Sequence, residues 1–360
     1  MTISIAEPRL GVGEYDRLLE VAASGQLGDG RLVRRFESAF ADYCGVSHGV
    51  ATANGTTALH AALHALGIGP GDAVVTTPFS FVASANAIRL CGARPVFADV
   101  NPRTLNLEAT AVQAALEEHD DIAAILAVHL YGLPAAVGPL RELADEHDVA
   151  LVEDAAQAHG ATVNGRRIGS FGDVACFSFY PTKNLTTGEG GMIVTDDESL
   201  AETAARFVNH GRTGRYAHAD VGHNFRLTSL GAGLGLAQLE RLADLLDVRR
   251  RTAARYDEAL ADQSAIEAPP NPPGMTHAYH QYTVRSDYRD ELQDHLSEAG
   301  IDTAVYYPTP IHRLAAYTDV EATAPIAERA ARTVLSVPVH PSLSSREIDR
   351  VASALEEFVP

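Results

Sequence analysis

The chain has 360 residues, of which 46% are hydrophobic and 21% are charged, and its formal net charge is −19. This composition excludes intrinsic disorder, and the length predicts one large domain with a smaller one, or two domains. The acidity excludes a general nucleic-acid binder, because such a protein needs a basic face, and no apolar run is long enough to predict a membrane span.

Helical periods alternate with short apolar runs from about residue 31 to residue 195. This pattern predicts an α/β fold with a mostly parallel central sheet and helices on both faces. The expected strands are 48–53, 73–77, 95–99, 122–129 and 150–153, and the expected helices are 34–43, 57–66, 84–90, 110–118 and 139–146. The segment 162–167 is expected to form a hairpin, because its Asn-Gly pair suits a type I′ turn.

A different pattern follows residue 228. A long helical stretch to about residue 260 and a proline-rich loop precede a shorter mixture of elements. The expected strands are 279–285 and 304–307, and the expected helices are 289–300 and 345–358. We therefore expect a large α/β domain over residues 1–240 and a smaller α+β domain over residues 241–360, on which the N-terminal segment can pack.

Lys183 is the only lysine of the chain, and the other 27 basic residues are arginines. It lies in a loop between two apolar strands, before a glycine-rich turn at 188–191 that is expected to place it. Arginine stays protonated and cannot serve as an amine nucleophile, whereas a desolvated lysine can form a Schiff base. Lys183 is therefore the candidate nucleophile, and the alternative is that its survival is accidental.

Two further motifs lie where an expected strand ends. Residues 54–57 (NGTT) join a strand to a helix, whose free N–H groups suit a phosphate, although Thr56 or Thr57 could simply cap the helix. Glu153 and Asp154 are expected to point into the crevice at the carboxyl edge of the sheet, where such folds place ligands. A carboxylate there is a base, the partner of a protonated heterocycle, or only a solvated acid. No ligand spacing typical of a metal site occurs, so no metal is expected.

Together these motifs resemble the DegT/DnrJ/EryC1/StrS family of sugar aminotransferases, which use pyridoxal 5′-phosphate (PLP). The resemblance covers nearly the whole chain and rests on eight short motifs in a fixed order. These are 54–56 (NGT), 78–83 (PFSFVA), 153–160 (EDAAQAHG), 177–179 (FSF), 183–184 (KN), 222–226 (GHNFR), 306–312 (YYPTPIH) and 337–341 (VPVHP). It implies a fold-type I PLP-dependent transferase with a smaller C-terminal α+β domain.

The resemblance also implies roles for residues around the cofactor ring. Lys183 would hold PLP through a Schiff base and then move a proton between the substrate carbon and the cofactor. Asp154 would pair with the pyridine nitrogen and keep it protonated, which makes the ring an electron sink. Phe81 would stack on the ring, although it could equally be an ordinary core residue, and Gln157 would lie near the phenolic oxygen.

Other residues are expected, on the same resemblance, around the cofactor phosphate. Gly55, Thr56 and Ser178 would bind it from the same subunit. Asn224 would reach the phosphate of the neighbouring subunit, so the active sites would be shared in a homodimer. From the sequence alone, Asn224 is only a polar loop residue.

The resemblance implies a substrate as well. Glutamate would donate an amino group to the keto group of a nucleotide-linked 4-keto or 3-keto deoxysugar in ping-pong half-reactions. Loop residues expected to border the entrance and pair with the nucleotide diphosphate are His210, Arg212, Arg215, Arg226, His312 and Arg313. The alternatives are a keto-cyclitol or other non-nucleotide ketone, a sugar dehydratase, in which His replaces this lysine, and a catalytically silent regulatory protein on the same fold.

Three remaining features are given structural or cellular interpretations. The glycine-rich run 231–235 is expected to allow close helix packing and not to bind a dinucleotide. The run 249–251 (RRR) is interpreted as a solvated helix face. Cys44, Cys91 and Cys176 lack CxxC spacing and the first 17 residues lack a signal-peptide block, so a cytoplasmic protein is expected.

Overall fold

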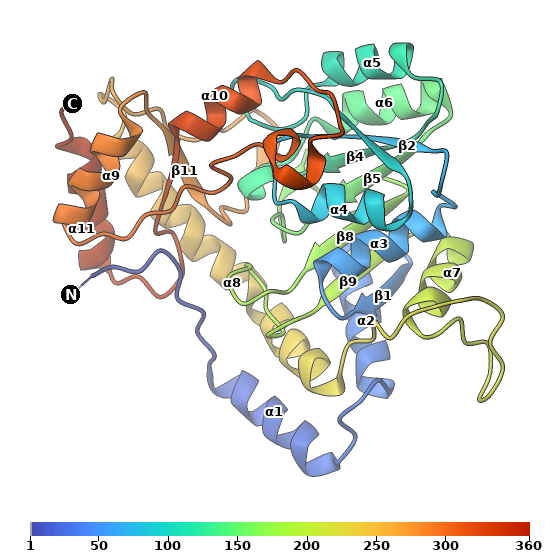
Figure 1. The fold of residues 1–360 in the computed structure, drawn as a ribbon. Coiled ribbons are helices and arrows are strands. Elements are labelled where there is room, and N and C mark those ends of the chain that lie inside the picture. Colours follow the sequence, from blue (N-terminus) through green and yellow to red (C-terminus); the bar gives the residue numbers. More distant parts are fainter. Residues whose placement is uncertain (1) are drawn as a thin grey trace.

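The computed structural model describes residues 2–360, and its centre is a seven-stranded sheet (Figure 1). The strands are β1 (His48–Thr52), β2 (Ala73–Thr76), β3 (Arg94–Phe97), β4 (Ile122–Val128), β5 (Ala150–Asp154), β8 (Val174–Ser178) and β9 (Gly191–Thr195), in the order β1-β9-β8-β5-β4-β2-β3. Only β9 runs antiparallel to its neighbours. The predicted mostly parallel sheet is confirmed.

Helices cover both faces of this sheet, as Figure 1 shows. One face carries α2 (Arg31–Cys44), α5 (Ala109–Glu118), α6 (Val137–His147) and α8 (Ser229–Ala259), and the other carries α3 (Gly55–Ala65), α4 (Ala83–Leu90) and α7 (Glu198–Val208). Successive strand residues point to opposite faces. In β4, for example, Ile125 packs against α5 and α6, whereas Leu126 packs against α3 and α4.

The C-terminal part has a second, smaller core. Its two-stranded antiparallel sheet pairs β11 (Tyr282–Arg285) with β12 (Val334–Val337), and α9 (Arg289–Glu298) and α11 (Ser345–Glu356) pack on it. Ile3 belongs to this core too, and Figure 1 shows both chain ends on the side of the molecule where α9 and α11 lie. The boundary predicted at residue 240 falls inside α8, which packs on α2 near its start and contributes Tyr256 to the smaller core near its end. The division into two domains therefore stays a prediction.

The hairpin predicted over 162–167 is confirmed as β6 (Thr162–Val163) and β7 (Arg166–Arg167), with φ of 50° at Asn164 and 80° at Gly165. It pairs with β10 (Met275–Thr276). The strand predicted over 304–307 is wrong: Ala304 forms only an isolated bridge, and Tyr307 has a φ of 67°, which an extended strand does not allow.

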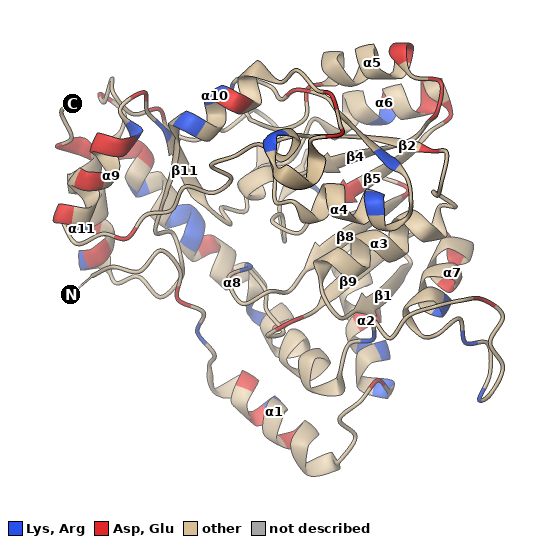
Figure 2. Cartoon of the chain, in the orientation of Figure 1, with Lys and Arg blue, Asp and Glu red and all other residues tan. Residues whose placement is uncertain are grey.

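Some elements were not expected from the sequence pattern. They are α1 (Val12–Ser24), α10 (Pro325–Thr333) and α7, together with the short 3₁₀ helices η1 (Leu130–Gly132), η2 (Ile311–Arg313) and η3 (Ala315–Tyr317). Within residues 2–360, no helix combines the length and apolarity that crossing a bilayer requires. Figure 2 shows acidic residues over much of the molecule, with several on α9 and α11.

Candidate active site

Lys183 lies in the loop that leaves β8, and its backbone N–H donates to the carbonyl of Tyr180 at 2.9 Å. Its side chain is half-buried, and its ammonium forms no hydrogen bond or ion pair with any other of residues 2–360. Burial lowers the pKa of Lys183 to about 8, and the nearby charge of Asp154 opposes part of that shift. An amine with this pKa is partly deprotonated near neutral pH, so it can act as a nucleophile.

Asp154 ends β5 and is buried at 5% exposure. Its Oδ2 accepts a hydrogen bond of 2.7 Å from the hydroxyl of Ser84, which lies on α4, and its Oδ1 accepts the N–H of Ala156 at 3.2 Å. These bonds fix the carboxylate on the side of the sheet that carries α3 and α4. The charge of Asp154 acts on both Lys183 and Tyr307, which places it among the groups of the site.

Glu153 does not point into the same crevice, and the expectation that both acids do is wrong. It is fully buried on the opposite face of the sheet, because adjacent strand residues alternate. Its carboxylate accepts hydrogen bonds from His129 at 3.1 Å and from the N–H groups of Phe171 and Gly172 at 2.7 and 2.8 Å. Burial alone would raise its pKa, but these bonds hold the pKa of Glu153 below its usual value. Glu153 is therefore a satisfied structural acid.

The turn between β1 and α3 brings two expected phosphate ligands together. Asn54 caps α3 by accepting the N–H of Thr57 at 2.9 Å, so neither Thr56 nor Thr57 is the cap. The first turn of a helix has N–H groups without partners inside the helix, here those of Gly55 and Thr56. A Cβ on Gly55 would lie 2.7 Å from Cβ of Ser178, so glycine permits this close approach. The result is a small turn that suits an anion.

The side chain of Gln157 is held by hydrogen bonds to Tyr131 and Tyr307. Its Oε1 accepts the backbone N–H of Tyr131 at 2.7 Å, and its Nε2 donates to the hydroxyl of Tyr307 at 3.0 Å. The two tyrosine rings stack with 6.1 Å between centroids. Phe81 differs from Gln157, because its ring is 59% exposed. An aromatic ring left open to solvent at the edge of the site is free to cover a ligand.

The residues expected at the substrate entrance fall into two groups. His210, Arg212, Arg215 and Arg226 line one surface cavity of about 480 Å³. His312 lies elsewhere, on η2, where its Nε2 is 3.1 Å from the carboxylate of Glu328, which also pairs with Arg313. The structure thus brings four of the six entrance residues together and leaves two apart.

Asn224 lies on the segment that follows this loop, and its side chain is exposed. The next residue, Phe225, accepts a hydrogen bond of 2.6 Å from the N–H of Ala53, directly before the capping residue Asn54. The backbone of the segment is thus tied to the β1–α3 turn, while the Asn224 side chain faces outward.

The two runs given structural interpretations have different outcomes. Close packing at 231–235 is confirmed, because a Cβ on Gly235 would lie 2.5 Å from the ring of Phe36. The interpretation of 249–251 as a solvated face is wrong for Arg249, which is only 6% exposed. Arg249 lies on the buried face of α8, and it lines a cavity of about 320 Å³ together with Lys183.

Several residues of this region carry no signal in the sequence as single residues. Ser84, His129 and Tyr307 are ordinary residue types, and their partners come from distant parts of the chain. A detectable signal existed for Arg249: it falls in helical register with the buried residues Leu242, Leu246, Ala253 and Tyr256. That spacing indicates a side chain that faces the core.

The arrangement has the parts needed by an aldehyde cofactor with a basic heterocycle and a phosphate. It offers a free amine at Lys183, a fixed carboxylate at Asp154 and an anion-binding turn at Gly55 and Ser178. Among residues 2–360, no group of three His, Cys, Asp or Glu side chains lies close enough together to hold a metal ion.

Comparison with known proteins gives consistent findings. The family model described as the DegT/DnrJ/EryC1/StrS aminotransferase family matches residues 8–356. GDP-perosamine synthase of Caulobacter vibrioides is 41% identical over 368 residues, which cover 99% of this chain and 98% of that protein. The dTDP-3-amino-3,4,6-trideoxy-alpha-D-glucose transaminase of Streptomyces venezuelae is 41% identical over 345 residues, covering 95% and 90%.

A solved structure is similar over nearly the full length. The crystal structure of S. venezuelae DesV in complex with a ketimine intermediate superposes with a TM-score of 0.93 at 40% identity, covering 96% of this chain and 95% of that one.

Proposed function

The chain belongs to the DegT/DnrJ/EryC1/StrS aminotransferase family, and from that premise we propose that it uses PLP to move an amino group from glutamate to the keto group of a nucleotide-linked deoxysugar. Membership of the family makes the chain an aminotransferase. We propose the cofactor, the residues that bind it and the substrate. The observation that carries it is the unpaired amine of Lys183 beside the fixed carboxylate of Asp154.

The residues present fit PLP. Lys183 would hold the cofactor covalently through an ε-amino group that nothing else in residues 2–360 binds. Asp154 would pair with the pyridine nitrogen, and the first turn of α3 with Ser178 would hold the phosphate, where only glycine fits at position 55. Phe81 would cover the ring, and Gln157 would lie beside it. When bound, PLP withdraws electrons from the carbon that exchanges the amino group.

The chain's own side chains then divide the work. Asp154 is already oriented by Ser84, so it can hold a proton on a ring nitrogen without rearranging. Lys183, once released, would take a proton from the substrate carbon and return it. A group with a pKa of about 8 can both accept and donate a proton near neutral pH. Proton transfer by such a positioned group typically accelerates a reaction by about 10²–10⁴-fold.

A nucleotide-linked substrate is supported by two observations. The named activities of the Caulobacter and Streptomyces relatives involve GDP-linked and dTDP-linked amino sugars. The cavity at His210, Arg212 and Arg226 contains guanidinium groups that form no ion pair within residues 2–360, and guanidinium binds diphosphate well. The three free cysteines fit a reducing compartment, so we also propose a cytoplasmic location.

A homodimer is part of the proposal. Phe81, Tyr180 and Val221 are 59%, 48% and 90% exposed, and α1 exposes Val12 and Leu19. Exposed apolar side chains of this size are common at an interface between proteins. A second copy would cover them and bring the exposed Asn224 to the partner's phosphate turn.

The test is a purified chain incubated with PLP, glutamate and a panel of ketones. We expect a visible absorption band from the lysine-bound cofactor, and amino transfer to a nucleotide-linked ketosugar but not to a free keto-cyclitol. Transfer only to the cyclitol would contradict the substrate class, and absence of the band would contradict the cofactor site. An elution volume of a monomer in gel filtration would contradict the homodimer.

A further inference from the structure

A cavity beside the lysine loop is lined by Arg249, which has no assigned role in holding the cofactor. It has a volume of about 320 Å³ and lies between the N-terminal segment at 6–11, the lysine loop, α8 and the loop at 340–342. Lys183 forms part of its wall, so the cavity adjoins the loop that holds the proposed nucleophile. The other residues that matter to its chemistry are Asn184, Arg249 and His340.

Arg249 is a buried cation without an acidic partner. Its Nη1 donates to the carbonyls of Tyr279 and His280 at 3.0 and 3.4 Å, and its Nε has no hydrogen-bond partner. It forms no ion pair within residues 2–360, and burial lowers its pKa to about 10. Burying an unpaired guanidinium is costly, because the charge loses its hydration and gains no counterion. A buried guanidinium of this kind is therefore a binding group for an anion.

The other groups around the cavity decide which anion. Arg241 is already neutralised by Glu14, at 2.6 Å. His340 donates through Nε2 to the carbonyl of Ser4 at 3.0 Å, and its Nδ1 is unpaired. Asn184 Oδ1 has no hydrogen-bond partner either, but like His340 Nδ1 it is closed off from solvent, so neither atom faces the open cavity. Glu7 and Arg9 lie exposed at the rim.

We propose that this cavity is the subsite of the amino donor, and that Arg249 binds a carboxylate of glutamate there. The proposal rests on the proposed function, because it names where one substrate of that reaction binds. An amino acid carries an anion for Arg249, and its amino-bearing carbon must come close to Lys183. A cavity lined by both residues meets both needs.

A nucleotide diphosphate is a poorer occupant. The cavity is near the lower limit of ligand pockets, which range over about 300–1,000 Å³. The Glu7 carboxylate at the rim also opposes a polyanion. The diphosphate has a better site at the arginines of the 210–226 loop. The two substrates thus use different cations, which lets the subsites be tested separately.

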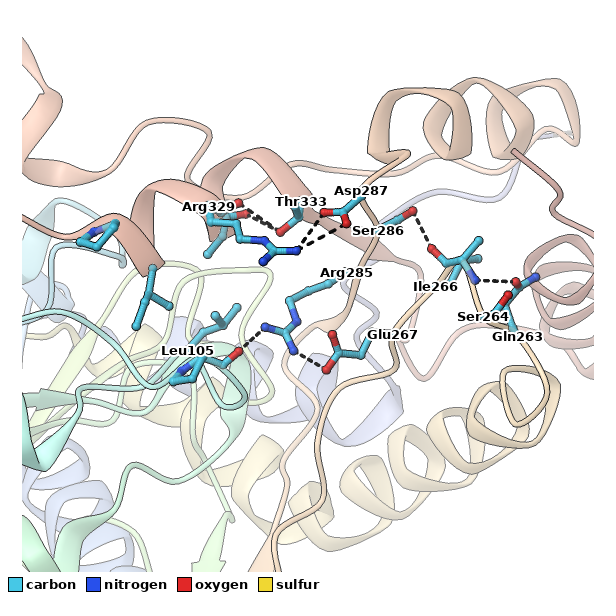
Figure 3. A pocket seen from close by; sticks show the side chains of 15 residues that line it. Leu105, Gln263, Ser264, Ile266, Glu267, Arg285, Ser286, Asp287, Arg329 and Thr333 are labelled. Atoms are coloured by element: carbon cyan, nitrogen blue, oxygen red, sulfur yellow. Dashed lines mark hydrogen bonds and ion pairs between the residues drawn. The ribbon is translucent and has the colours of Figure 1, made fainter.

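The larger cavity of Figure 3, about 680 Å³, provides the matched control. There Arg329 pairs with Asp287 at 3.3 Å, and Arg285 bonds to Glu267 and to the carbonyl of Pro102. Arg329→Gln therefore removes a guanidinium that already has a partner. Arg249→Gln removes one that has none.

Binding of glutarate, which has the two carboxylates of glutamate but no amino group, is measured by calorimetry on the full chain loaded with PLP. Arg249→Gln is expected to weaken binding at least about tenfold, since a charge-assisted hydrogen bond is lost. Arg249→Lys should retain part of the affinity, and Arg329→Gln should bind as the unchanged chain does. Equal affinity in Arg249→Gln and the unchanged chain, or no binding to either, would overturn the proposal.

Two further readings separate this proposal from the proposed function. The KM for glutamate should rise in Arg249→Gln, while the KM for the ketosugar stays constant. If Arg249→Gln instead weakened the binding of uridine diphosphate and left the binding of glutarate unchanged, the donor assignment would be overturned. If Arg249→Gln does not fold, Arg249→Met replaces it: it removes the same charge and should weaken glutarate binding more than Arg249→Lys does. Arg249-dependent glutarate binding without any amino transfer would refute the proposed function and leave the carboxylate site standing.

Discussion

Two of the cavities lined by arginine, the one beside Lys183 and the one of Figure 3, differ in size and in the state of their charges. The cavity of Figure 3, beside α10, is the larger, at about 680 Å³ against about 320 Å³, yet its guanidinium groups are paired with Asp287 and Glu267. The smaller one contains Lys183 and Arg249, neither of which has an acidic partner within residues 2–360. Cavity size alone therefore says little about binding, whereas an unsatisfied buried cation has a definite chemical requirement.

The largest effect is expected where the small cavity meets the cofactor. Lys183→Arg keeps the charge but removes the deprotonatable amine, so covalent attachment of PLP and proton transfer should both be lost. We expect kcat to fall by at least about 10³-fold, in the range of a lost general base and nucleophile. Arg329→Gln in the large cavity should leave kcat unchanged. Steady-state kinetics check this, and transamination retained in Lys183→Arg would remove Lys183 from the mechanism.

The pH dependence of PLP attachment should show the low pKa of the same amine. Below about pH 8 Lys183 is mainly protonated, so the rate of attachment should rise with pH and be half-maximal near pH 8, not near 10.5. Asp154→Asn should shift the midpoint further down, because the charge of Asp154 raises the pKa of Lys183. Stopped-flow absorbance measures the rates. A midpoint near 10 would mean that burial does not act on this amine.

Stability should change in opposite directions in the two cavities. Burial lowers the pKa of Arg249 from 12.5 to about 10, which corresponds to a cost of about 3 kcal/mol for burying its charge. Removing the guanidinium recovers this cost but also removes its two hydrogen bonds to carbonyls, which together stabilise the fold by about 2 kcal/mol. Arg249→Met should therefore raise the free energy of unfolding by about 1 kcal/mol, whereas Arg285→Met should lower it by up to about 1 kcal/mol. Urea denaturation compares the two, and a loss in Arg249→Met would show that its charge is stabilised by groups within the chain.

The smallest effect is expected from the exposed pair of the large cavity. Arg329 and Asp287 are each 70% exposed in their side chains. Asp287→Asn should change the free energy of unfolding by less than about 0.5 kcal/mol, with no effect on kcat. The same denaturation experiment checks it; a change above about 1 kcal/mol would show that these charges are coupled to the rest of the molecule.

The sequence predicted the central sheet and most of its helices because long periodic segments with buried apolar faces determine them. It failed where that signal is absent. α1 turns Val12, Tyr15 and Leu19 outward, so its apolar residues do not mark a core face. The strand predicted at 304–307 had suitable residue types, but Tyr307 takes a positive φ and contacts Tyr131 and Gln157, which are distant in the sequence.

For the candidate site, the sequence identified residues by type and motif but not by partner. Lys183, Asp154, Gly55 and Ser178 were predicted as site residues, and the structure brings Gly55 and Ser178 close together. Glu153 and Arg249 were misplaced for the same reason, since side-chain direction depends on the register of the element. The alternation of β5 turns Glu153 away, and the helical period of α8 turns Arg249 inward.

The most direct test uses the fact that Lys183 is the only lysine of the chain. The protein is incubated with PLP, reduced with borohydride, digested and analysed by peptide mass spectrometry, so that the only other amine is the chain's N-terminus. We predict one stoichiometric pyridoxyl group, on the peptide that contains Lys183. An unmodified Lys183 peptide, or a pyridoxyl group found only at the N-terminus, would contradict the assignment of Lys183 as the residue that holds the cofactor.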